Sequence, residues 1–237
     1  MHKTETIDYQ DGETTLEAYC AYPAGNEKKP AVLVVHDWSG KNEFACEKAR
    51  QLAELGYVGF ALDMYGKGKM GHTKEEKTAL MEPLSKDRSK LIKRILAAYD
   101  TVKQLDAVNP RHIGAIGFCF GGLCALDLAR SGADVAGVVS FHGLLHGIPN
   151  HTPKSIKAKV LILHGYDDPM AKPDQVISFA NEMTAANVDW QINMYSQTMH
   201  GFTNPEANDP SFGTVFNKRT TERAWFAMRH FFNEIFQ

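Results

Sequence analysis

The sequence predicts a doubly wound α/β domain whose sheet is mostly parallel and carries an antiparallel hairpin at its N-terminal edge. Short continuous apolar runs, typical of strands buried on both faces of a parallel sheet, alternate with segments that have helical apolar spacing. Near the N-terminus, Asp11-Gly12 separates two strand-like runs and indicates a β-hairpin. The 237 residues contain no repeat and no linker-like segment. We therefore expect residues 1–237 to form a single domain.

The predicted strands are short segments bounded by turn residues. The first two form the hairpin, and the later ones are apolar runs that end in polar or glycine-containing loops. In chain order the predicted strands are 4–9, 14–22, 31–35, 57–62, 113–118, 135–141, 159–163 and 190–195.

The predicted helices lie between these strands and after the last of them. Gly56 ends the first helix, Pro83 interrupts the stretch between the second and third, and Asn109-Pro110 marks a turn. The segment 64–90 is longer than a simple crossover requires, so a small lid-like insertion is expected there. The predicted helices are 44–55, 73–81, 87–104, 123–130, 175–187 and 220–236.

Composition limits the classes of partner. The net charge is −2 and apolar residues make up 43% of the chain, which gives no reason to expect nucleic acid or an anionic membrane as a partner. No apolar run approaches the roughly 20 residues of a membrane helix, and the first residues lack the apolar core of a signal peptide. We expect a cytoplasmic protein, a monomer or small homo-oligomer, that acts on a small molecule.

The stretch from Gly117 to Gly122 has the pattern of a nucleophile elbow. It reads Gly-Phe-Cys-Phe-Gly-Gly, follows an apolar run and precedes a helix-compatible segment. A strand that turns sharply into a helix needs small residues beside the apex, and Gly117 and Gly121 stand two positions either side of Cys119. The alternative is a glycine-rich turn that contains a buried structural cysteine.

Two further residues complete a possible catalytic set. Asp168 and His200 each follow a predicted strand, and catalytic groups in open α/β sheets gather at the carboxyl ends of strands. The order Cys119, Asp168, His200 is the nucleophile, acid, base order of α/β-hydrolases. His200 would take the thiol proton and Asp168 would orient the imidazole. Asp167 is a rival for the acid.

Neither the cysteines nor the histidines indicate a metal or another cofactor. The four cysteines form no C-x-x-C pair and no zinc framework. His142, His146 and His151 cluster in the sequence, but no carboxylate or cysteine falls at ligand spacing among them. We therefore predict no metal and no cofactor.

Taken together, these motifs resemble the dienelactone hydrolase family. The resemblance rests on the elbow, the segment 164–169 (His-Gly-Tyr-Asp-Asp-Pro), His200-Gly201-Phe202 and the early loop 36–40 (His-Asp-Trp-Ser-Gly), and it extends from about Leu33 to the last helix. It implies an α/β-hydrolase fold and the hydrolysis of cyclic enol lactones or related small esters by a Cys-His-Asp triad without a metal.

The resemblance also implies roles for backbone and loop groups. The N–H groups of Phe120 and Trp38 would hold the oxyanion. Asp37 occupies the position of a family carboxylate that contacts the resting thiol. The well-known members carry a glutamate there, which is one methylene longer.

Several other residues are expected to line the pocket. Asn204 stands four residues beyond the expected base, where the well-known lactone hydrolases use an arginine to bind the substrate carboxylate. Arg88 is either a second such arginine or a solvated helix charge. The predicted pocket-lining residues are His36, Tyr65, Arg88, Phe141, His142 and Phe202, with Trp38 adding to the aromatic lining.

The leading functional hypothesis is a hydrolase that cleaves a carboxylic ester or lactone of a small molecule through Cys119. Two alternatives stay open at this point. One is a thioesterase or peptidase-like acyl hydrolase on the same triad, and the other is a non-catalytic hydrolase-fold protein that binds a small ligand.

Overall fold

The structure is a computed structural model, and it describes residues 3–148 and 155–237. The chain divides into two compact units, Met1–Ile116 and Gly117–Gln237. The expectation of a single domain stays a prediction. Within the described ranges, no helix has the combined length and apolar character that a membrane crossing needs.

The N-terminal unit is built on strands in the order β1-β2-β4-β3. β1 pairs antiparallel with β2 from Lys3 opposite Tyr22 to Asp11 opposite Thr14, which confirms the predicted hairpin. Gly12 has φ +58° in the connecting turn, a conformation that glycine adopts without strain. β3 and β4 are parallel, and β2 runs antiparallel to β4. The bounds are β1 (Lys3–Asp11), β2 (Thr14–Tyr22), β3 (Lys29–Val35) and β4 (Val58–Leu62).

Three helices complete this unit: α1 (Glu43–Glu54), α2 (Lys74–Lys86) and α3 (Arg88–Lys103). Gly59 of β4 lets α1 pack closely, because a Cβ atom there would lie 2.2 Å from the carbonyl oxygen of Ala49. α2 begins with a capping box between Thr73 and Glu76. The predicted break at Pro83 is wrong, since Pro83 lies inside α2. The helix tolerates it because Ala79, whose carbonyl loses its partner, is exposed to water.

β5 (Val108–Phe118) leads from the first unit into the second. The predicted turn at Asn109-Pro110 is wrong, because both residues belong to this strand. Proline is tolerated near the start of a strand, and the positions around Pro110 are exposed or half-buried. Only the second half of β5 is a fully buried apolar run, which is why the sequence pattern indicated residues 113–118 alone.

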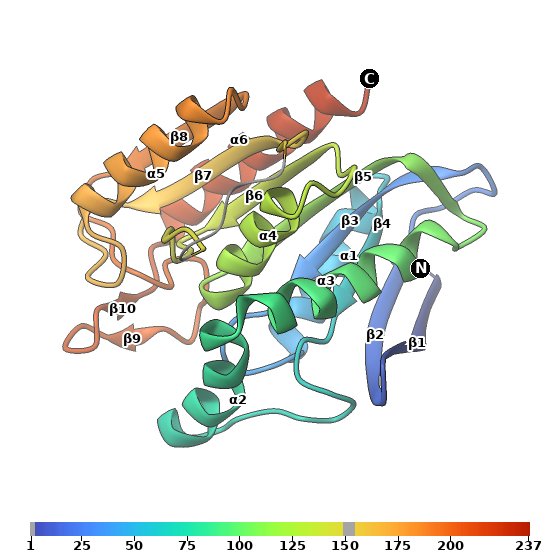
Figure 1. Cartoon of the computed structure of the whole chain (residues 1–237), viewed down its shortest axis with the longest axis horizontal. Helices are drawn as coiled ribbons and strands as arrows, with labels where there is room; N and C mark the ends of the chain where they lie inside the picture. Colours follow the sequence, from blue (N-terminus) through green and yellow to red (C-terminus); the bar gives the residue numbers. More distant parts are fainter. Residues whose placement is uncertain (1–2, 149–154) are drawn as a thin grey trace. The chain divides into compact units, whose positions relative to one another are not determined.

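The C-terminal unit contains three parallel strands, β6 (Gly137–Phe141), β7 (Lys159–Gly165) and β8 (Trp190–Tyr195). These pairings support the predicted mostly parallel sheet. Figure 1 shows α4 and α5 in front of these strands and α6 behind them. The remaining elements of this unit are α4 (Phe120–Arg130), α5 (Pro173–Ala185), β9 (Asn208–Asp209), β10 (Thr214–Val215) and α6 (Lys218–Ile235).

α6 packs an apolar side against β6. A Cβ atom on Gly137 would lie 2.5 Å from Ile235 and 2.8 Å from Phe231, so helix and strand approach closely. Met228 and Phe232 are fully buried on the same side of the helix. The helix begins at Asn217, whose side chain accepts the N–H of Thr220 at 3.1 Å.

Candidate active site

Cys119 stands at a strained turn between β5 and α4. Its φ of 55° and ψ of −116° lie outside the usual regions for a residue other than glycine. The turn is so tight that a Cβ atom on Gly117 would lie 1.9 Å from the carbonyl oxygen of Gly121. Cys119 is partly exposed, and its N–H donates to Phe141 O at 3.1 Å. The geometry is that of the predicted elbow, with the thiol at its apex.

The start of α4 lies against the end of β6. A Cβ atom on Gly122 would lie 2.4 Å from Ser140 Oγ and 2.7 Å from the Cα of Gly143. Gly122 therefore also has a steric reason to be glycine, which the elbow pattern alone did not specify. Phe120 is the first residue of α4. Backbone N–H groups at a helix N-terminus point outward and favour nearby negative charge.

Burial separates Asp168 from its rival Asp167. Asp168 is 2% exposed, whereas Asp167 is exposed to solvent. One carboxylate oxygen of Asp168 accepts the N–H of Met170 at 2.8 Å, which leaves the other for a second partner. The neighbouring Gly165 permits a close approach, since a Cβ atom there would lie 2.4 Å from the carbonyl oxygen of Thr198.

The second partner of Asp168 is His200. The distance from His200 Nδ1 to Asp168 Oδ2 is 2.7 Å, and both side chains are buried. Backbone hydrogen bonds hold His200 on both sides, from its own N–H to Gly213 O at 3.0 Å and from the N–H of Val215 to its carbonyl at 3.1 Å. The imidazole is thus fixed by its ring and by its backbone.

The electrostatics of His200 involve Cys119 directly. Burial alone lowers the pKa of His200, but the charge of Cys119 and the hydrogen bond to Asp168 outweigh it and raise that pKa to about 10. Nε2 is buried and makes no hydrogen bond of regular geometry in the described part of the chain. The arrangement therefore favours an imidazolium next to the sulfur of Cys119.

His142 braces the loop that carries His200. Its ring nitrogen Nε2 lies 2.7 Å from Thr203 Oγ1, and its ring stands edge-on to both His200 and Phe202, with centroids 5.1 Å apart in each case. Burial, followed by the positive charge of His200, lowers the pKa of His142 well below its usual value, so the ring is neutral. Phe141 is fully buried and stacks on Phe118 at 4.9 Å. The pocket-lining roles of Phe141, His142 and Phe202 stay predictions.

Sequence reasoning missed three supporting residues in this unit. The Thr203 hydroxyl is hydrogen-bonded to the ring of His142. Thr198 Oγ1 lies 3.0 Å from Thr220 Oγ1 at the start of α6. The N–H of Asp167 donates to Thr198 O at 3.0 Å, which joins the two loops that carry the acid and the base. A threonine two residues before His200 and another three residues after it were the available signal.

The early loop of the N-terminal unit is held by its own side chains. One carboxylate oxygen of Asp37 accepts the N–H of Ser39 at 2.8 Å and also the Ser39 hydroxyl. His36 Nε2 accepts the N–H of Met64 at 3.1 Å, and Tyr65 donates its hydroxyl proton to Trp38 O at 3.0 Å. Burial lowers the pKa of His36. The roles predicted for the Trp38 N–H and for Asp37 beside the thiol stay predictions.

Two arginines of α3 are buried rather than solvated. Arg88 is 6% exposed, so its interpretation as a solvated helix charge is wrong. Arg94, which sequence reasoning did not single out, donates to Asp11 Oδ2 at 2.7 Å and to Met64 O at 2.9 Å. Arg94 thereby ties the hairpin turn to the loop after β4.

The histidine cluster considered for a metal is only partly covered, because His151 lies outside the described residues. Within residues 3–148 and 155–237, no group of three or more histidine, cysteine, aspartate or glutamate side chains is arranged to hold a metal ion.

The model of the dienelactone hydrolase family matches residues 16–236. The chain belongs to the dienelactone hydrolase family. Its fold is accordingly the α/β-hydrolase fold, and the family makes it an ester or lactone hydrolase.

This member of the dienelactone hydrolase family is similar to a lactonase and to a protein of known crystal structure. A probable 2-oxo-3-(5-oxofuran-2-ylidene)propanoate lactonase of Bradyrhizobium sp. is 28% identical to it, over 84% of this chain and 86% of that protein. The crystal structure of a dienelactone hydrolase-like promiscuous phosphotriesterase from metagenomic libraries has a TM-score of 0.93 and 31% identity. That match covers 99% of this chain and 98% of the other.

Proposed function

We propose that the chain hydrolyses a carboxylic ester or lactone of a small molecule with Cys119 as nucleophile, His200 as base and Asp168 as the residue that orients His200. The observation that carries the proposal is the 2.7 Å bond from His200 Nδ1 to Asp168 Oδ2, combined with a His200 pKa that Cys119 and Asp168 raise to about 10. Buried pairs with strongly shifted pKa values concentrate at active sites. The Cys119 thiol at the elbow is partly exposed, and its charge acts on His200.

The reaction runs in two halves. The Cys119 thiolate attacks the carbonyl carbon, a C–S bond forms, and the carbonyl electrons move onto oxygen. The Phe120 N–H stabilises this oxyanion, and the second donor predicted at Trp38 stays a prediction. As the C–O bond breaks, the His200 imidazolium gives its proton to the departing alkoxide. Water then attacks the thioester, His200 takes a proton from it, and the acid leaves with Cys119 regenerated.

Replacement of the nucleophile tests the proposal. Cys119→Ala should abolish hydrolysis of an activated ester such as p-nitrophenyl acetate, and intact mass spectrometry of the native protein should show an added acetyl group on Cys119. Cys124→Ala is the matched control, because Cys124 lies in α4, the helix that follows Cys119, and is fully buried. Hydrolysis that survives Cys119→Ala would refute the proposal.

Identifying the substrate class requires activity measurements on several compounds rather than on one. The family and the name of the Bradyrhizobium relative favour lactones. The name of the metagenomic relative adds phosphotriesters as a second candidate. Lactones, p-nitrophenyl esters, thioesters, short peptides and a dialkyl p-nitrophenyl phosphate should be compared by kcat/KM. Thioester or peptide preference would favour the acyl-hydrolase alternative, and binding without turnover would favour the non-catalytic one.

A further inference from the structure

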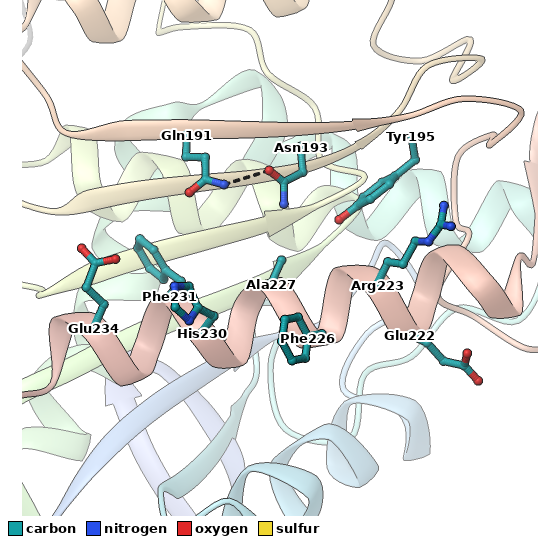
Figure 2. A pocket seen from close by; sticks show the side chains of 10 residues that line it. All are labelled: Gln191, Asn193, Tyr195, Glu222, Arg223, Phe226, Ala227, His230, Phe231 and Glu234. Atoms are coloured by element: carbon teal, nitrogen blue, oxygen red, sulfur yellow. Dashed lines mark hydrogen bonds between the residues drawn. The ribbon is translucent and has the colours of Figure 1, made fainter.

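A groove runs between β8 and α6 and includes none of the three proposed catalytic residues. It has a volume of about 580 Å³. Figure 2 shows Gln191, Asn193 and Tyr195 pointing from β8 toward α6, with the Gln191 side chain bonded to Asn193 at 2.9 Å. The helix side of the groove combines apolar side chains with charged or titratable ones: Phe226, Ala227 and Phe231 beside Glu222, Arg223, His230 and Glu234. Both walls of the groove therefore present polar groups, and large apolar side chains come from the helix side.

The strand beside the groove is an edge. Among the described residues, β8 pairs with β7 alone. The carbonyls of Asp189 and Tyr195 accept N–H groups on the β7 side, from Val160 at 2.9 Å and Tyr166 at 2.8 Å. Because successive residues of a strand alternate their hydrogen-bonding direction, the peptide groups of the even-numbered residues Trp190, Ile192 and Met194 point to the opposite, open side.

This edge lacks the usual protection against pairing. Proteins blunt exposed edges with lysine or other charges, proline, bulges or covering segments. β8 reads Trp-Gln-Ile-Asn-Met-Tyr and contains no charge, proline or glycine. Its six residues thus present an uncharged template for another strand.

The adjacent face of α6 carries a large apolar side chain among charges. Phe226 is 71% exposed. Glu222 and His230 are exposed one turn before and one turn after it. In two antiparallel copies of this helix related by a two-fold axis at Phe226, residues equally distant from 226 face each other, so Glu222 of each copy meets His230 of the other.

The other charged residues of α6 also acquire partners in this arrangement, and they are less well matched or further from the two-fold axis. Arg219 would meet Asn233, which is neutral. Arg223 and Arg229 would meet each other, but both stand about 60° round the helix from Phe226, at 100° per residue, where water screens like charges. Lys218 would meet Glu234 of the other copy, an oppositely charged pair farther from the axis, while Glu222 and His230 meet one turn from it.

We infer that this surface, defined by β8 and the Phe226 face of α6, joins two copies of the chain into a symmetric dimer. The two β8 strands pair antiparallel, and the Phe226 side chains of the two copies meet at the two-fold axis between the helices. A second copy fits better than a foreign peptide because one chain supplies both the open edge and the apolar side chain, and each can meet its own copy across a two-fold axis. A two-fold interface requires that self-complementarity.

The first experiment measures mass in solution. Sedimentation equilibrium should give twice the chain mass of 26.4 kDa, with a concentration-dependent dissociation. Phe226→Glu should weaken the dimer about 30-fold or more, as expected for a central anchor, and Met194→Lys should weaken it by placing a charge on the edge. Ile177→Glu is the matched control: Ile177 is 61% exposed on α5, outside the proposed interface, so the dimer should persist.

The second experiment tests the register. Glu222→Lys or His230→Glu alone should weaken dimerisation several-fold. The double variant should restore it, because the introduced lysine of each copy would then face the introduced glutamate of the other. A photo-crosslinking benzoylphenylalanine at position 226 should link to α6 of a second, isotope-labelled copy. Unchanged far-UV circular dichroism and ester hydrolysis establish that each variant is folded, whereas loss of the dimer should itself lower the melting temperature.

Three results would overturn the inference. The first is a wild-type protein that stays monomeric over the accessible concentration range, which would leave the groove to a different partner. The second is a dimer that resists Phe226→Glu. The third is a dimer in which position 226 links to no residue of the other copy's α6.

Discussion

Arg130 and His200 are two buried basic side chains of the C-terminal unit, and both are held by carboxylates. Arg130 is 1% exposed and uses all five of its N–H donors. Glu182 accepts two of them, at 2.8 and 2.7 Å, and Asp127 accepts one at 3.3 Å. The carbonyls of Leu145 and His146 accept the other two, at 3.2 and 3.4 Å. This arginine thereby fastens the segment after β6 to α4 and α5.

His200 has one ring nitrogen with a regular hydrogen bond and one without. Nδ1 is bonded to Asp168, while the buried Nε2 makes no regular hydrogen bond in the described structure, although the charge of Cys119 acts on the ring. A buried nitrogen with no partner would cost about 1–3 kcal/mol, but Cys119 acts on this ring by its charge and by a side-chain hydrogen bond outside the regular range. The two clusters differ in their partners: carboxylates and backbone carbonyls hold Arg130, whereas His200 is shared between a carboxylate and the sulfur of Cys119.

Asp168→Asn should produce the largest effect, on activity alone. An amide at this position disfavours the imidazolium and the correct tautomer, so kcat should fall by about 10⁴-fold while the protein stays folded. Asp167→Asn is the control, because Asp167 is adjacent but exposed, and its kcat should be unchanged. Steady-state kinetics on an activated ester measure both. Equal losses in the two variants would contradict the assignment of the acid.

Arg130→Met should produce the next largest effect, on stability alone. Removing one partner of a buried charge network costs about 3–5 kcal/mol, because Asp127 and Glu182 are left without their cation. Urea denaturation measures the loss, and kcat per folded molecule should be retained. Lys157→Met breaks the exposed 3.4 Å pair with Asp134 and should cost less than about 1 kcal/mol. A similar cost for both the lysine and the arginine variant would show that burial does not set the difference.

Cys119→Ser should lower the pKa of His200 from about 10, because it removes the thiolate that helps to raise it. Because the folded-state pKa of His200 lies above the usual imidazole value of about 6.5, its ionisation adds to the free energy of unfolding. That contribution is fully present below about pH 6.5 and is lost as the pH rises through about 10. NMR titration of the imidazole measures the pKa, and urea denaturation at several pH values measures the linkage. If the pKa of His200 were unchanged in Cys119→Ser, the sulfur of Cys119 would not be a group that raises it.

Thr203→Val should have the smallest effect. It removes the hydroxyl 2.7 Å from His142 Nε2 and leaves that buried nitrogen unpaired, at a cost of about 1–3 kcal/mol. Because His142 braces the His200 loop, kcat should fall modestly with little change in KM. Thr203→Ser keeps the hydroxyl and should restore both stability and kcat. Failure of the serine variant to restore them would point to packing of the methyl group instead.

The sequence alone predicted the fold class, the hairpin and the segments that carry Cys119, Asp168 and His200. These features depend on local patterns: an apolar run that ends in a turn, and glycines where the backbone must approach closely. Gly117 is the clearest case, since its requirement arises from the backbone of Gly121 only four residues away. The family membership and the fold were both available from such motifs.

Only the tertiary structure decided which partners those residues meet. Asp168 is buried and bonded to His200 whereas Asp167 is exposed, and hydrogen bonds joined His142 to Thr203, 61 residues further along the chain, and Arg130 to Glu182, 52 residues further. Asp37 bonds Ser39, and Pro83 stays within α2. The physical reason is range: local sequence sets backbone conformation over a few residues, whereas long-range pairings depend on which segments the packed core brings together.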